Sequence, residues 1–394
     1  MNILIINSGS SSIKFQLIEM PTEVLICSGL AERIGDEDAV LKYKTNTFDF
    51  EQIEPLNSHK EALQKIVALL LHSEKGVIQN TDEIEVVGHR VVHGGNSFSN
   101  TTVINSKVKQ EIQKYATLAP LQNPHNLIGI LVSEQLFPTA KQIAVFDTAF
   151  HQTIPEKAKK YAIPNNLYSK ENIEVYGFHG TSHKYVSEKA IEFLQIKKSK
   201  IISIHLGNGC SMTAVLDGKS IDHSMGFTPS NGLIMGSRSG DIDHSIIFYL
   251  VHTLGYRLDD VNNLLTNESG MLGLTGYIDL RDIQKEAENG NSACILSLTM
   301  NAYRIKKYIG TYTAALNGVD AIIFTAGIGE NSSLIRKLVC SDMDFFGIHL
   351  DETKNELKSQ NLRDLSTAAS KVKILVIPTN EELEIAKQAF DLLN

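Results

Sequence analysis

The stretch Ile3-Leu-Ile-Ile-Asn7-Ser-Gly-Ser-Ser-Ser-Ile-Lys14-Phe-Gln-Leu-Ile18 decides the fold. A short apolar run, typical of a buried strand, leads into a turn with one glycine and four serines, and a second strand follows from Phe15. The turn offers backbone and hydroxyl donors for phosphate oxygens, with Lys14 as a cation behind them. It is not a Walker A loop, because a second glycine before the lysine is absent and no helix follows. Taken alone, the turn also fits a plain β-hairpin.

The same pattern returns nearly half the chain later. Residues 201–216 again run strand, glycine turn and strand, with Gly207 in the place of Gly9. This spacing indicates a duplicated domain, since solenoid repeats are only about 20 to 50 residues long. Further β-branched runs at 142–146, 321–324 and 373–377 predict buried strands, and the pattern at 58–72 predicts a helix with Ser58 and Glu61 as a capping box. Mixed α/β architecture follows.

Length and composition limit the function classes. A chain of 394 residues should divide into two domains of comparable size, and Phe150 lies near a plausible boundary. The net charge of -8 disfavours nucleic acid as a partner. Four scattered cysteines indicate neither a zinc cage nor a disulfide framework, so we expect a reducing cytoplasm. No segment resembles a signal peptide or reaches the roughly 20 apolar residues of a membrane span.

Two further glycine segments follow predicted strands. They are His205-Leu-Gly-Asn-Gly209 and Gly327-Ile-Gly-Glu-Asn331, and the second lacks the third glycine of a dinucleotide fingerprint. Each is weak evidence alone. Together with the first turn, they predict one split nucleotide site at the ends of strands.

Two arginines stand in glycine-rich segments. Arg90 lies in Gly88-His-Arg-Val-Val-His-Gly-Gly95, and Arg238 lies between two glycines in Gly236-Ser-Arg-Ser-Gly240. A guanidinium fork suits carboxylate and phosphoryl oxygens, so the pair is suited to an acid substrate and the group it receives. For either arginine alone, a surface ion pair explains the pattern equally well.

The histidines and carboxylates leave several alternatives. His179 and His183 have helical spacing, but Gly180 replaces the glutamate of a zinc-binding His-Glu-x-x-His, so we favour His179 as a donor to a phosphoryl group and His183 as a capping or packing residue. Asp147 ends a strand and is a candidate active-site carboxylate. Asp241 and Asp243 fit either of two roles, as metal ligands or as residues that form turns, and we favour the turns. Glu381 reaches a Mg²⁺ or caps the last helix.

The order of these segments resembles the acetate kinase family from end to end. The resemblance rests on blocks at 7–14, 88–95, 119–124, 146–151, 177–183, 205–209, 239–243, 326–331 and 378–382. It implies a duplicated actin-like (ribonuclease H-like) two-domain fold with an active-site cleft between the domains. The implied N-terminal domain is 1–149 plus 382–394, and 150–381 forms the nucleotide-binding domain that carries a homodimer interface.

The resemblance also implies a role for each matching residue. Asn7 and Glu381 would hold Mg²⁺, with Mn²⁺ as an alternative, and Arg90 would bind the carboxylate of the acid. His179 and Arg238 would stabilise the transferred phosphoryl group, and Asp147 would be the essential carboxylate. The implied acid pocket consists of Val92, Leu121, Phe178 and Pro229. The implied ATP contacts are Lys14, His205, Leu206, Gly207, Asn208, Gly209, Asp279, Leu280, Arg281, Gly327, Ile328, Gly329, Glu330 and Asn331.

The implied reaction is reversible, in-line transfer of the γ-phosphoryl group of ATP to acetate, giving acetyl phosphate and ADP. Because ionised acetate needs no deprotonation, we expect Asp147 to position a partner and not to act as a base. Gln122, Ser230-Asn231 and His244 depart from the family's usual residues at positions that we expect near the substrate. A propionate kinase and, from another class, a non-catalytic actin-like nucleotide switch remain the alternatives.

Overall fold

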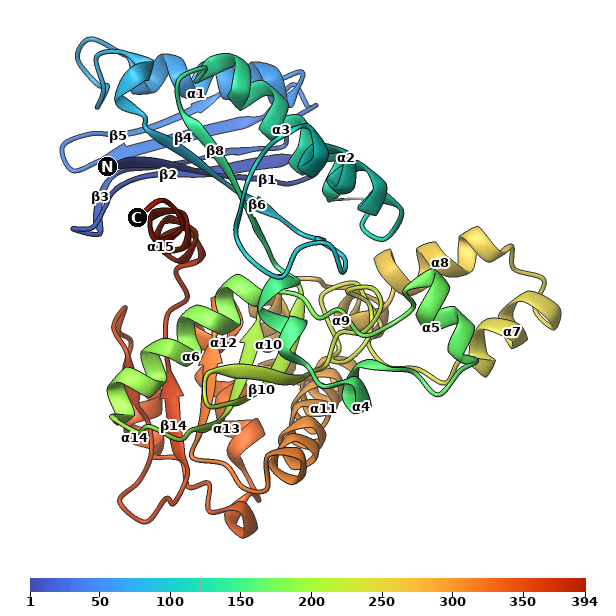
Figure 1. Ribbon diagram of the computed structural model, residues 1–394. Coiled ribbons are helices and arrows are strands. Elements are labelled where there is room, and N and C mark those ends of the chain that lie inside the picture. The colour runs from blue at the N-terminus through green and yellow to red at the C-terminus, as the bar shows by residue number, and fades with distance from the viewer. Residues whose placement is uncertain (121) are drawn as a thin grey trace. The chain divides into compact units, whose positions relative to one another are not determined.

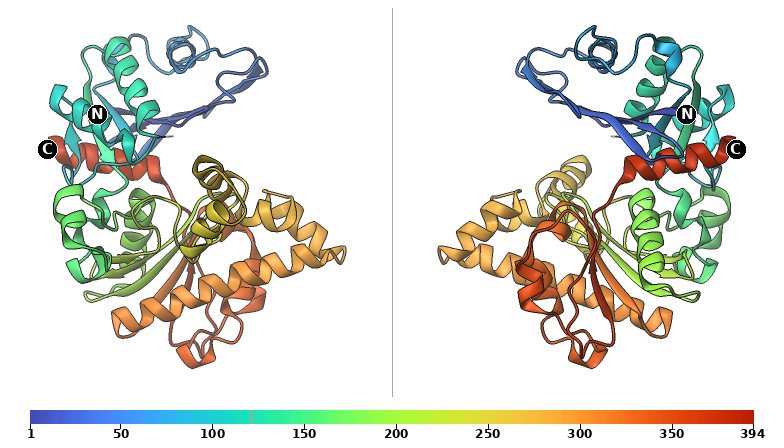
Figure 2. Two further views of the ribbon diagram at one scale, coloured as in Figure 1. Left: turned by 90° about the vertical axis from the view of Figure 1, so that its right-hand side faces the viewer. Right: turned by 90° about the vertical axis from the view of Figure 1, so that its left-hand side faces the viewer.

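The computed structural model describes residues 1–120 and 122–394, which form two compact units (Figure 1). Unit 1 contains residues 1–152 and 380–394, and unit 2 contains residues 153–379. In each unit, helices cover a mixed β-sheet (Figure 2). Within the described ranges, no helix has the length and apolar character needed to cross a bilayer.

Unit 1 is built on a sheet with the strand order β5-β4-β3-β2-β1-β6-β8-β7. From β5 to β1 each strand pairs antiparallel with the next, β1, β6 and β8 pair in parallel, and β7 pairs antiparallel with β8. The strands are β1 (Asn2–Ser8), β2 (Ser12–Glu19), β3 (Val24–Glu32), β4 (Val40–Thr45), β5 (Asp49–Ile53), β6 (Val86–Val91), β7 (Thr102–Val103) and β8 (Lys141–Phe146).

The helices of unit 1 bury both faces of this sheet. On one face, α1 and α3 contribute Leu63, Ile66 and Val132 to a large apolar core, and on the other α15 contributes Ile385 and Ala389 (Figure 1). Apolar residues on alternate positions of the central strands fill both layers, which is why these strands read as buried. The helical segments are α1 (His59–Leu70), η1 (Thr81–Glu83), α2 (Ser106–Lys114), η2 (Tyr115–Thr117), α3 (Asn123–Leu136), η3 (Ala149–Thr153) and α15 (Glu381–Leu393).

The predicted capping box at α1 is only half present. The hydroxyl of Ser58 accepts from the backbone N–H of Glu61 at 3.2 Å, as predicted. The carboxylate of Glu61, however, accepts from the backbone N–H and the side-chain amide of Asn57, each at 3.0 Å, and not from Ser58. The reciprocal bond of the capping box therefore joins Glu61 to Asn57, one residue before the predicted partner Ser58.

Unit 2 has a second sheet, with the order β11-β10-β9-β12-β14-β13. Helix α6 packs against β9 and β12, and α11 packs against β9 and β10. The strands are β9 (Lys200–Leu206), β10 (Cys210–Leu216), β11 (Lys219–His223), β12 (Ala321–Thr325), β13 (Arg363–Asp364) and β14 (Lys373–Val376). The helical segments are α4 (Glu156–Lys159), α5 (Asn165–Glu171), α6 (Gly180–Leu194), α7 (Ser245–His252), α8 (Leu258–Asn267), α9 (Gly270–Thr275), α10 (Leu280–Glu288), α11 (Ser292–Leu316), α12 (Ala326–Asn331), α13 (Ser333–Cys340), η4 (Asp344–Phe346) and α14 (Glu352–Glu356).

The predicted duplication is visible in the hairpins. β1 and β2 are joined at Gly9, whose N–H donates to the carbonyl of Ser12 at 2.8 Å, and β9 and β10 are joined at Gly207, whose N–H donates to the carbonyl of Gly209 at 3.1 Å. In both units the first strand of the hairpin also pairs in parallel with a later strand, β6 or β12. The predicted strands are thus confirmed. The segment Gly327–Asn331 belongs to a short helix, α12, and not to a turn.

Candidate active site

Arg90 forms the centre of a charged cluster in unit 1. It lies on β6, and its Nε and Nη2 atoms donate to both carboxylate oxygens of Asp147, which follows β8, at 2.7 to 3.1 Å. Its Nη1 lies 3.9 Å from the carboxylate of Glu381, the first residue of α15. Burial lowers the pKa of Arg90, but the carboxylates of Asp147, Glu381 and Glu382 outweigh this effect and raise it. Arg90 therefore stays a cation.

Lys14 and two glutamates extend this cluster. Lys14 forms an ion pair with Glu382 at 2.8 Å, so two cations face the three carboxylates of Asp147, Glu381 and Glu382. Burial raises the pKa of Glu381, and the neighbouring Asp147 and Glu382 add to the rise while Arg90 and Lys14 oppose it.

The Asn7–Lys14 hairpin is held from its inner side. His59 contacts the carbonyl of Gly9 through Nε2 at 2.6 Å, and the amide of Asn126 donates to the carbonyl of Ser8 at 2.7 Å. Asn7 and Lys14 face each other in the antiparallel register. These bonds fix the backbone of the turn and leave the serine hydroxyls of residues 10 and 11 exposed.

The residues implied for an acid pocket come from both units. In unit 1, the backbone N–H of Val92 donates to Asn126 at 3.0 Å, while Leu121 lies outside the described residues. In unit 2, Phe178 is buried and Pro229 gives its carbonyl to Nη1 of Arg238. The carbonyl of Pro229 therefore orients Arg238, the arginine that the family resemblance associates with the transferred phosphoryl group.

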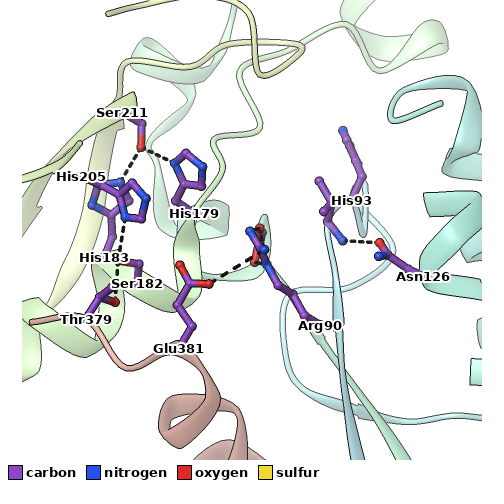
Figure 3. Close-up of polar contacts among 12 residues, drawn as sticks. Arg90, His93, Asn126, His179, Ser182, His183, His205, Ser211, Thr379 and Glu381 are labelled. Atoms are coloured by element: carbon purple, nitrogen blue, oxygen red, sulfur yellow. Dashed lines mark hydrogen bonds and ion pairs between the residues drawn. The ribbon is translucent and has the colours of Figure 1, made fainter. Parts of the chain in front are cut away.

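A network of histidines and serines lies in unit 2 (Figure 3). His179 has a left-handed backbone with φ 54° and directly precedes α6, a strained conformation that the surrounding bonds must stabilise. Its Nδ1 lies 2.9 Å from Oγ of Ser211, which also lies 2.8 Å from Nε2 of His183. Nδ1 of His183 contacts Ser203 at 2.8 Å. Both ring nitrogens of His183 thus face serines, as expected for a packing residue and not for a zinc ligand.

The ring of His205 packs against the ring of His179. The two imidazole rings stack with their centroids 4.2 Å apart and an angle of 17° between their planes. Nδ1 of His205 lies 2.9 Å from the hydroxyl of Ser182 on α6. Since β9 carries His205 into the glycine turn, the stack joins the start of α6 to that turn.

Arg238 lies against the turn at Gly209. A Cβ built on Gly209 would lie 3.1 Å from Nη2 of Arg238 and 3.4 Å from the ring of His179, so a larger residue would press on both side chains. Burial lowers the pKa of Arg238, and the described residues include no carboxylate that forms an ion pair with it. Arg238 and His179 therefore present donors on the same side of the Gly209 backbone.

A cavity of about 630 Å³ lies on the other side of this turn in unit 2. Three walls contain predicted nucleotide contacts: the end of β9, the start of α10 and helix α12. The predicted residues that line it are Leu206, Gly207, Asn208, Asp279, Leu280, Arg281, Gly327, Ile328 and Asn331.

Other predicted nucleotide contacts lie elsewhere. His205 and Gly209 belong to the histidine and arginine cluster, and Lys14 lies in unit 1. A Cβ on Gly329 would lie 3.3 Å from the backbone of Phe324, so Gly329 packs on β12. The carboxylate of Glu330 accepts from the N–H of Thr379 at 3.0 Å. Gly329 and Glu330 do not line the cavity.

Several lining residues were not predicted. A Cβ on Gly236 would lie 1.9 Å from the side chain of Asn208, and one on Gly270, at φ +61°, would lie 2.2 Å from the carbonyl of Met235. The two glycines allow three chain segments to approach one another closely. Gly236, which lies two residues before Arg238, and Gly270 are the sequence features that could have indicated these lining residues. The additional lining residues are Cys210, Ile234, Met235, Gly236, Met271, Ile278, Gln284, Asn301 and Ser332.

Asp241 and Asp243 stabilise turns. Asp241 accepts from the N–H of Gly232 at 2.7 Å and from the hydroxyl of Tyr308 at 2.6 Å, and Asp243 accepts from the N–H of Ser245 at 2.8 Å. Among residues 1–120 and 122–394, no three histidine, cysteine or acidic side chains are grouped as a metal site. The turn interpretation of these two aspartates fits their contacts.

The comparisons with known proteins identify the family. The sequence matches the acetokinase family over residues 2–387. The chain belongs to this family. It is 63% identical over 393 residues to the acetate kinase of Flavobacterium johnsoniae, and the match covers 100% of both chains. Its fold matches the crystal structure of Porphyromonas gingivalis acetate kinase with a TM-score of 0.93 at 41% identity, again over 100% of both chains.

A second solved structure is equally similar in fold. The propionate kinase from Francisella tularensis matches with a TM-score of 0.93 at 42% identity and covers 98% of each chain. Together, the structural matches confirm the predicted α/β class with the duplicated actin-like fold of the acetokinase family.

The positions that depart from the family's usual residues lie in different places. Gln122 is the N-cap of α3, where its carbonyl accepts from the N–H of Asn126 at 3.0 Å. His244 is the exposed N-cap of α7 and contacts the ring of Phe248. His244 therefore belongs to an exposed helix and not to the surroundings of Arg238.

Proposed function

We propose that this protein transfers the γ-phosphoryl group of ATP reversibly to acetate, giving acetyl phosphate and ADP. The observation that carries the proposal is the half-buried guanidinium of Arg238, which has no carboxylate ion-pair partner among the described residues and lies beside His179 and Gly209. A half-buried cation without an ion-pair partner is a ready receptor for a phosphoryl group. Membership of the acetokinase family supports acetate as the acceptor.

The cavity of unit 2 is the proposed nucleotide site. Ile234, Met271 and Ile328 give it apolar walls suited to a base, and Asp279 and Arg281 give it a polar edge suited to a ribose or phosphate. The N–H and guanidinium of Arg281 donate to Asp279, lower the pKa of that carboxyl to about 2 and keep it ionised. The Gly207 turn would then bring backbone N–H groups to the phosphates.

The charged cluster of unit 1 suits a divalent cation. Mg²⁺ commonly uses one or two carboxylates together with waters and phosphate oxygens, so the carboxylate of Glu381 can take part without a group of three acidic ligands. We propose that Glu381 and Asn7 hold Mg²⁺, with Mn²⁺ as an alternative ion. When bound, the ion neutralises charge on the transferring phosphates.

Asp147 acts in this proposal by holding Arg90. Its two oxygens take Nε and Nη2 of the guanidinium, which leaves Nη1 as the donor directed toward Glu381. Acetate is already ionised at neutral pH, so no base is needed for its attack. Arg90 would bind the acid's carboxylate, and His179 and Arg238 would stabilise the phosphoryl group between two anionic reactants.

An assay that traps acetyl phosphate as its hydroxamate tests the activity. We expect product only with ATP, acetate and a divalent ion together, and complete absence of product from the folded protein would overturn the proposal. A non-catalytic nucleotide switch would instead bind ADP and give no hydroxamate.

Propionate kinase is the second candidate, because a propionate kinase has nearly the same fold similarity as the acetate kinase compared above. One methylene in an apolar pocket changes discrimination by only about 1 to 3 kcal/mol. We expect a higher kcat/KM for acetate than for propionate. The opposite order would assign propionate as the substrate.

We further propose that the protein forms a homodimer through unit 2, which would join the proposed nucleotide-binding domain of 150–381 to its copy. No residue of α7 is buried, although its sequence Ser-Ile-Ile-Phe-Tyr-Leu-Val-His is almost entirely apolar. Figure 1 shows α7 and α8 projecting from the rest of unit 2. Phe248, Tyr249 and Leu258 are each more than half exposed, an arrangement typical of an interface.

Light scattering tests this assembly. The wild type should have the mass of a dimer, and Phe248→Glu should shift it to a monomer; a monomeric wild type would contradict the proposal.

The buried, free thiols of the described cysteines fit the proposed reducing cytoplasm.

A further inference from the structure

Four polar residues of unit 2 form a chain of hydrogen bonds that ends at His205, and Figure 3 labels three of them, Thr379, Ser182 and His205. The N–H of Thr379 donates to the carboxylate of Glu330 at 3.0 Å, and the hydroxyl of Thr379 donates to Ser182 at 2.8 Å. The hydroxyl of Ser182 lies 2.9 Å from Nδ1 of His205. The chain thus links α12, the segment after β14, α6 and β9.

The direction of these bonds decides which nitrogen of His205 carries its hydrogen. A serine hydroxyl has a single hydrogen. Because Ser182 accepts from Thr379, its own hydrogen is available for Nδ1 of His205. Nδ1 is then the acceptor, and a neutral His205 must carry its hydrogen on Nε2.

Nε2 of His205 lies on the side of the glycine turn. A Cβ built on Gly207 would lie 3.8 Å from this atom. An Nε2–H there offers a donor to an anion at the turn, whereas the opposite tautomer would offer a lone pair and repel it. The same ring stacks on His179, so the tautomer and the plane of His205 both bear on the site.

Glu330 holds the beginning of the chain. Its backbone carbonyl accepts from Arg336 and Arg363, each at 3.0 Å, and Arg336 also donates to the carbonyl of Gly329 at 2.9 Å. These bonds fix the main chain of α12. The carboxylate of Glu330 can therefore hold Thr379, which follows β14 in the polypeptide. The other side of α12 lines the cavity through Gly327 and Ile328.

We infer that Thr379 and Ser182 are positioning residues that fix His205 as the Nε2–H tautomer, and that Glu330 secures Thr379. The inferred benefit to catalysis rests on the proposed function, whereas the tautomer itself does not. Thr379→Val is the sharpest variant, because valine has nearly the same shape and keeps the N–H that Glu330 accepts. Ser182 would lose its donor and become free to accept from Nδ1.

¹⁵N NMR of histidine-labelled full-length protein, with His205 assigned from the His205→Gln variant, tests the tautomer directly. We expect Nε2–H in the wild type and in Thr379→Ser, and a shift of the Nδ1 signal toward the protonated form in Thr379→Val. An Nδ1–H tautomer in the wild type, or an unchanged signal in Thr379→Val, would overturn the inference. The wild-type spectrum decides even where a variant does not fold.

Kinetics test the consequence. Thr379→Val should lower kcat about three- to tenfold, the range expected for one neutral hydrogen bond, with the KM for acetate unchanged and with recovery in Thr379→Ser. Glu330→Ala should resemble Thr379→Val, whereas Glu330→Gln, which keeps an acceptor oxygen, should resemble the wild type. Equal kcat in Thr379→Val and the wild type contradicts the positioning role. A wild type that makes no hydroxamate refutes the proposed function and leaves the NMR result valid.

Discussion

Arg90 and Arg238 have the same guanidinium in opposite surroundings. Arg90 is bound by two oxygens of Asp147 and lies near Glu381, and these carboxylates raise its pKa. Arg238 is bound by the carbonyl of Pro229, and burial lowers its pKa. Carboxylates of the protein balance the charge of Arg90. We therefore expect the position of its guanidinium to matter more than its charge. The charge of Arg238 has no such balance among the described residues and is available to a phosphoryl group.

Arg238→Ala should have the largest effect on catalysis. Removal of one preorganised donor to a developing charge typically lowers kcat about 10² to 10³-fold, and we expect this range here because Nη2 of Arg238 lies against the Gly209 turn, beside His179. The KM for acetate should change little. Arg238→Lys is the matched control: it keeps the charge without the fork and should recover only part of kcat. A rise in KM alone would place Arg238 with substrate binding and remove the contrast with Arg90.

Arg90→Ala should act on acetate binding and on stability. We expect the KM for acetate to rise about 10-fold or more with a smaller change in kcat, since a uniform binding contact is lost. Loss of one partner from a buried pair also destabilises proteins by about 3 to 5 kcal/mol, and Asp147 is only 1% exposed. Urea unfolding measures this effect.

The double variant Arg90→Ala/Asp147→Asn is the control for the stability effect. It neutralises the carboxylate that Arg90 binds and removes Arg90 at the same time, so it should recover much of the free energy of unfolding that the single change loses. Equal losses in the single and double variants would show that the ion pair is not responsible. Arg238→Ala should leave a smaller stability loss, since no carboxylate would be left unpaired.

The sequence predicted both arginines but could not separate them. Arg90 and Arg238 stand in similar glycine-rich segments, and the choice between a paired and an unpaired guanidinium depends on Asp147, which lies 57 residues beyond Arg90 in the chain. The strands and the duplicated hairpin were predictable because they depend on local apolar patterns. The orientation of Glu330 was not predictable, since α12 presents Gly327, Ile328 and Asn331 to the cavity but Glu330 to Thr379.

The cavity walls show the same limit. Residues such as Ile278 and Asn301 come from distant segments that meet only because Gly236 and Gly270 allow close backbone approach. A glycine in the sequence does not indicate which segment it will contact. Strand ends, in contrast, can be located from the sequence, and the hypotheses for Asp147 and His205 rest on them.

A pH experiment sharpens the contrast at Glu381. Its pKa is raised in the folded protein, so the folded state binds this proton more tightly than the unfolded chain does. Above the raised pKa, ionised Glu381 lowers stability; the loss disappears as the pH falls to the ordinary pKa of glutamate. Glu381→Gln should therefore unfold at higher urea than the wild type at pH 7, and the gap should close toward pH 4. A gap independent of pH would contradict the raised pKa. The same variant should need more Mg²⁺ for activity.

Among the variants of the charged cluster, Lys14→Met should have the smallest effect on stability. Lys14 pairs with Glu382 at 2.8 Å, as Arg90 pairs with Asp147, but the lysine side chain is 50% exposed and water screens its charge. Such pairs contribute about 0 to 1 kcal/mol, so the free energy of unfolding should fall by less than after Arg90→Ala. Lys44→Met, which removes an exposed pair with Asp49 at 3.7 Å, is the control and should change stability still less. A loss as large as that of Arg90→Ala would mean that the buried Glu382 carboxylate, and not the exposure of its cation, sets the strength of these pairs.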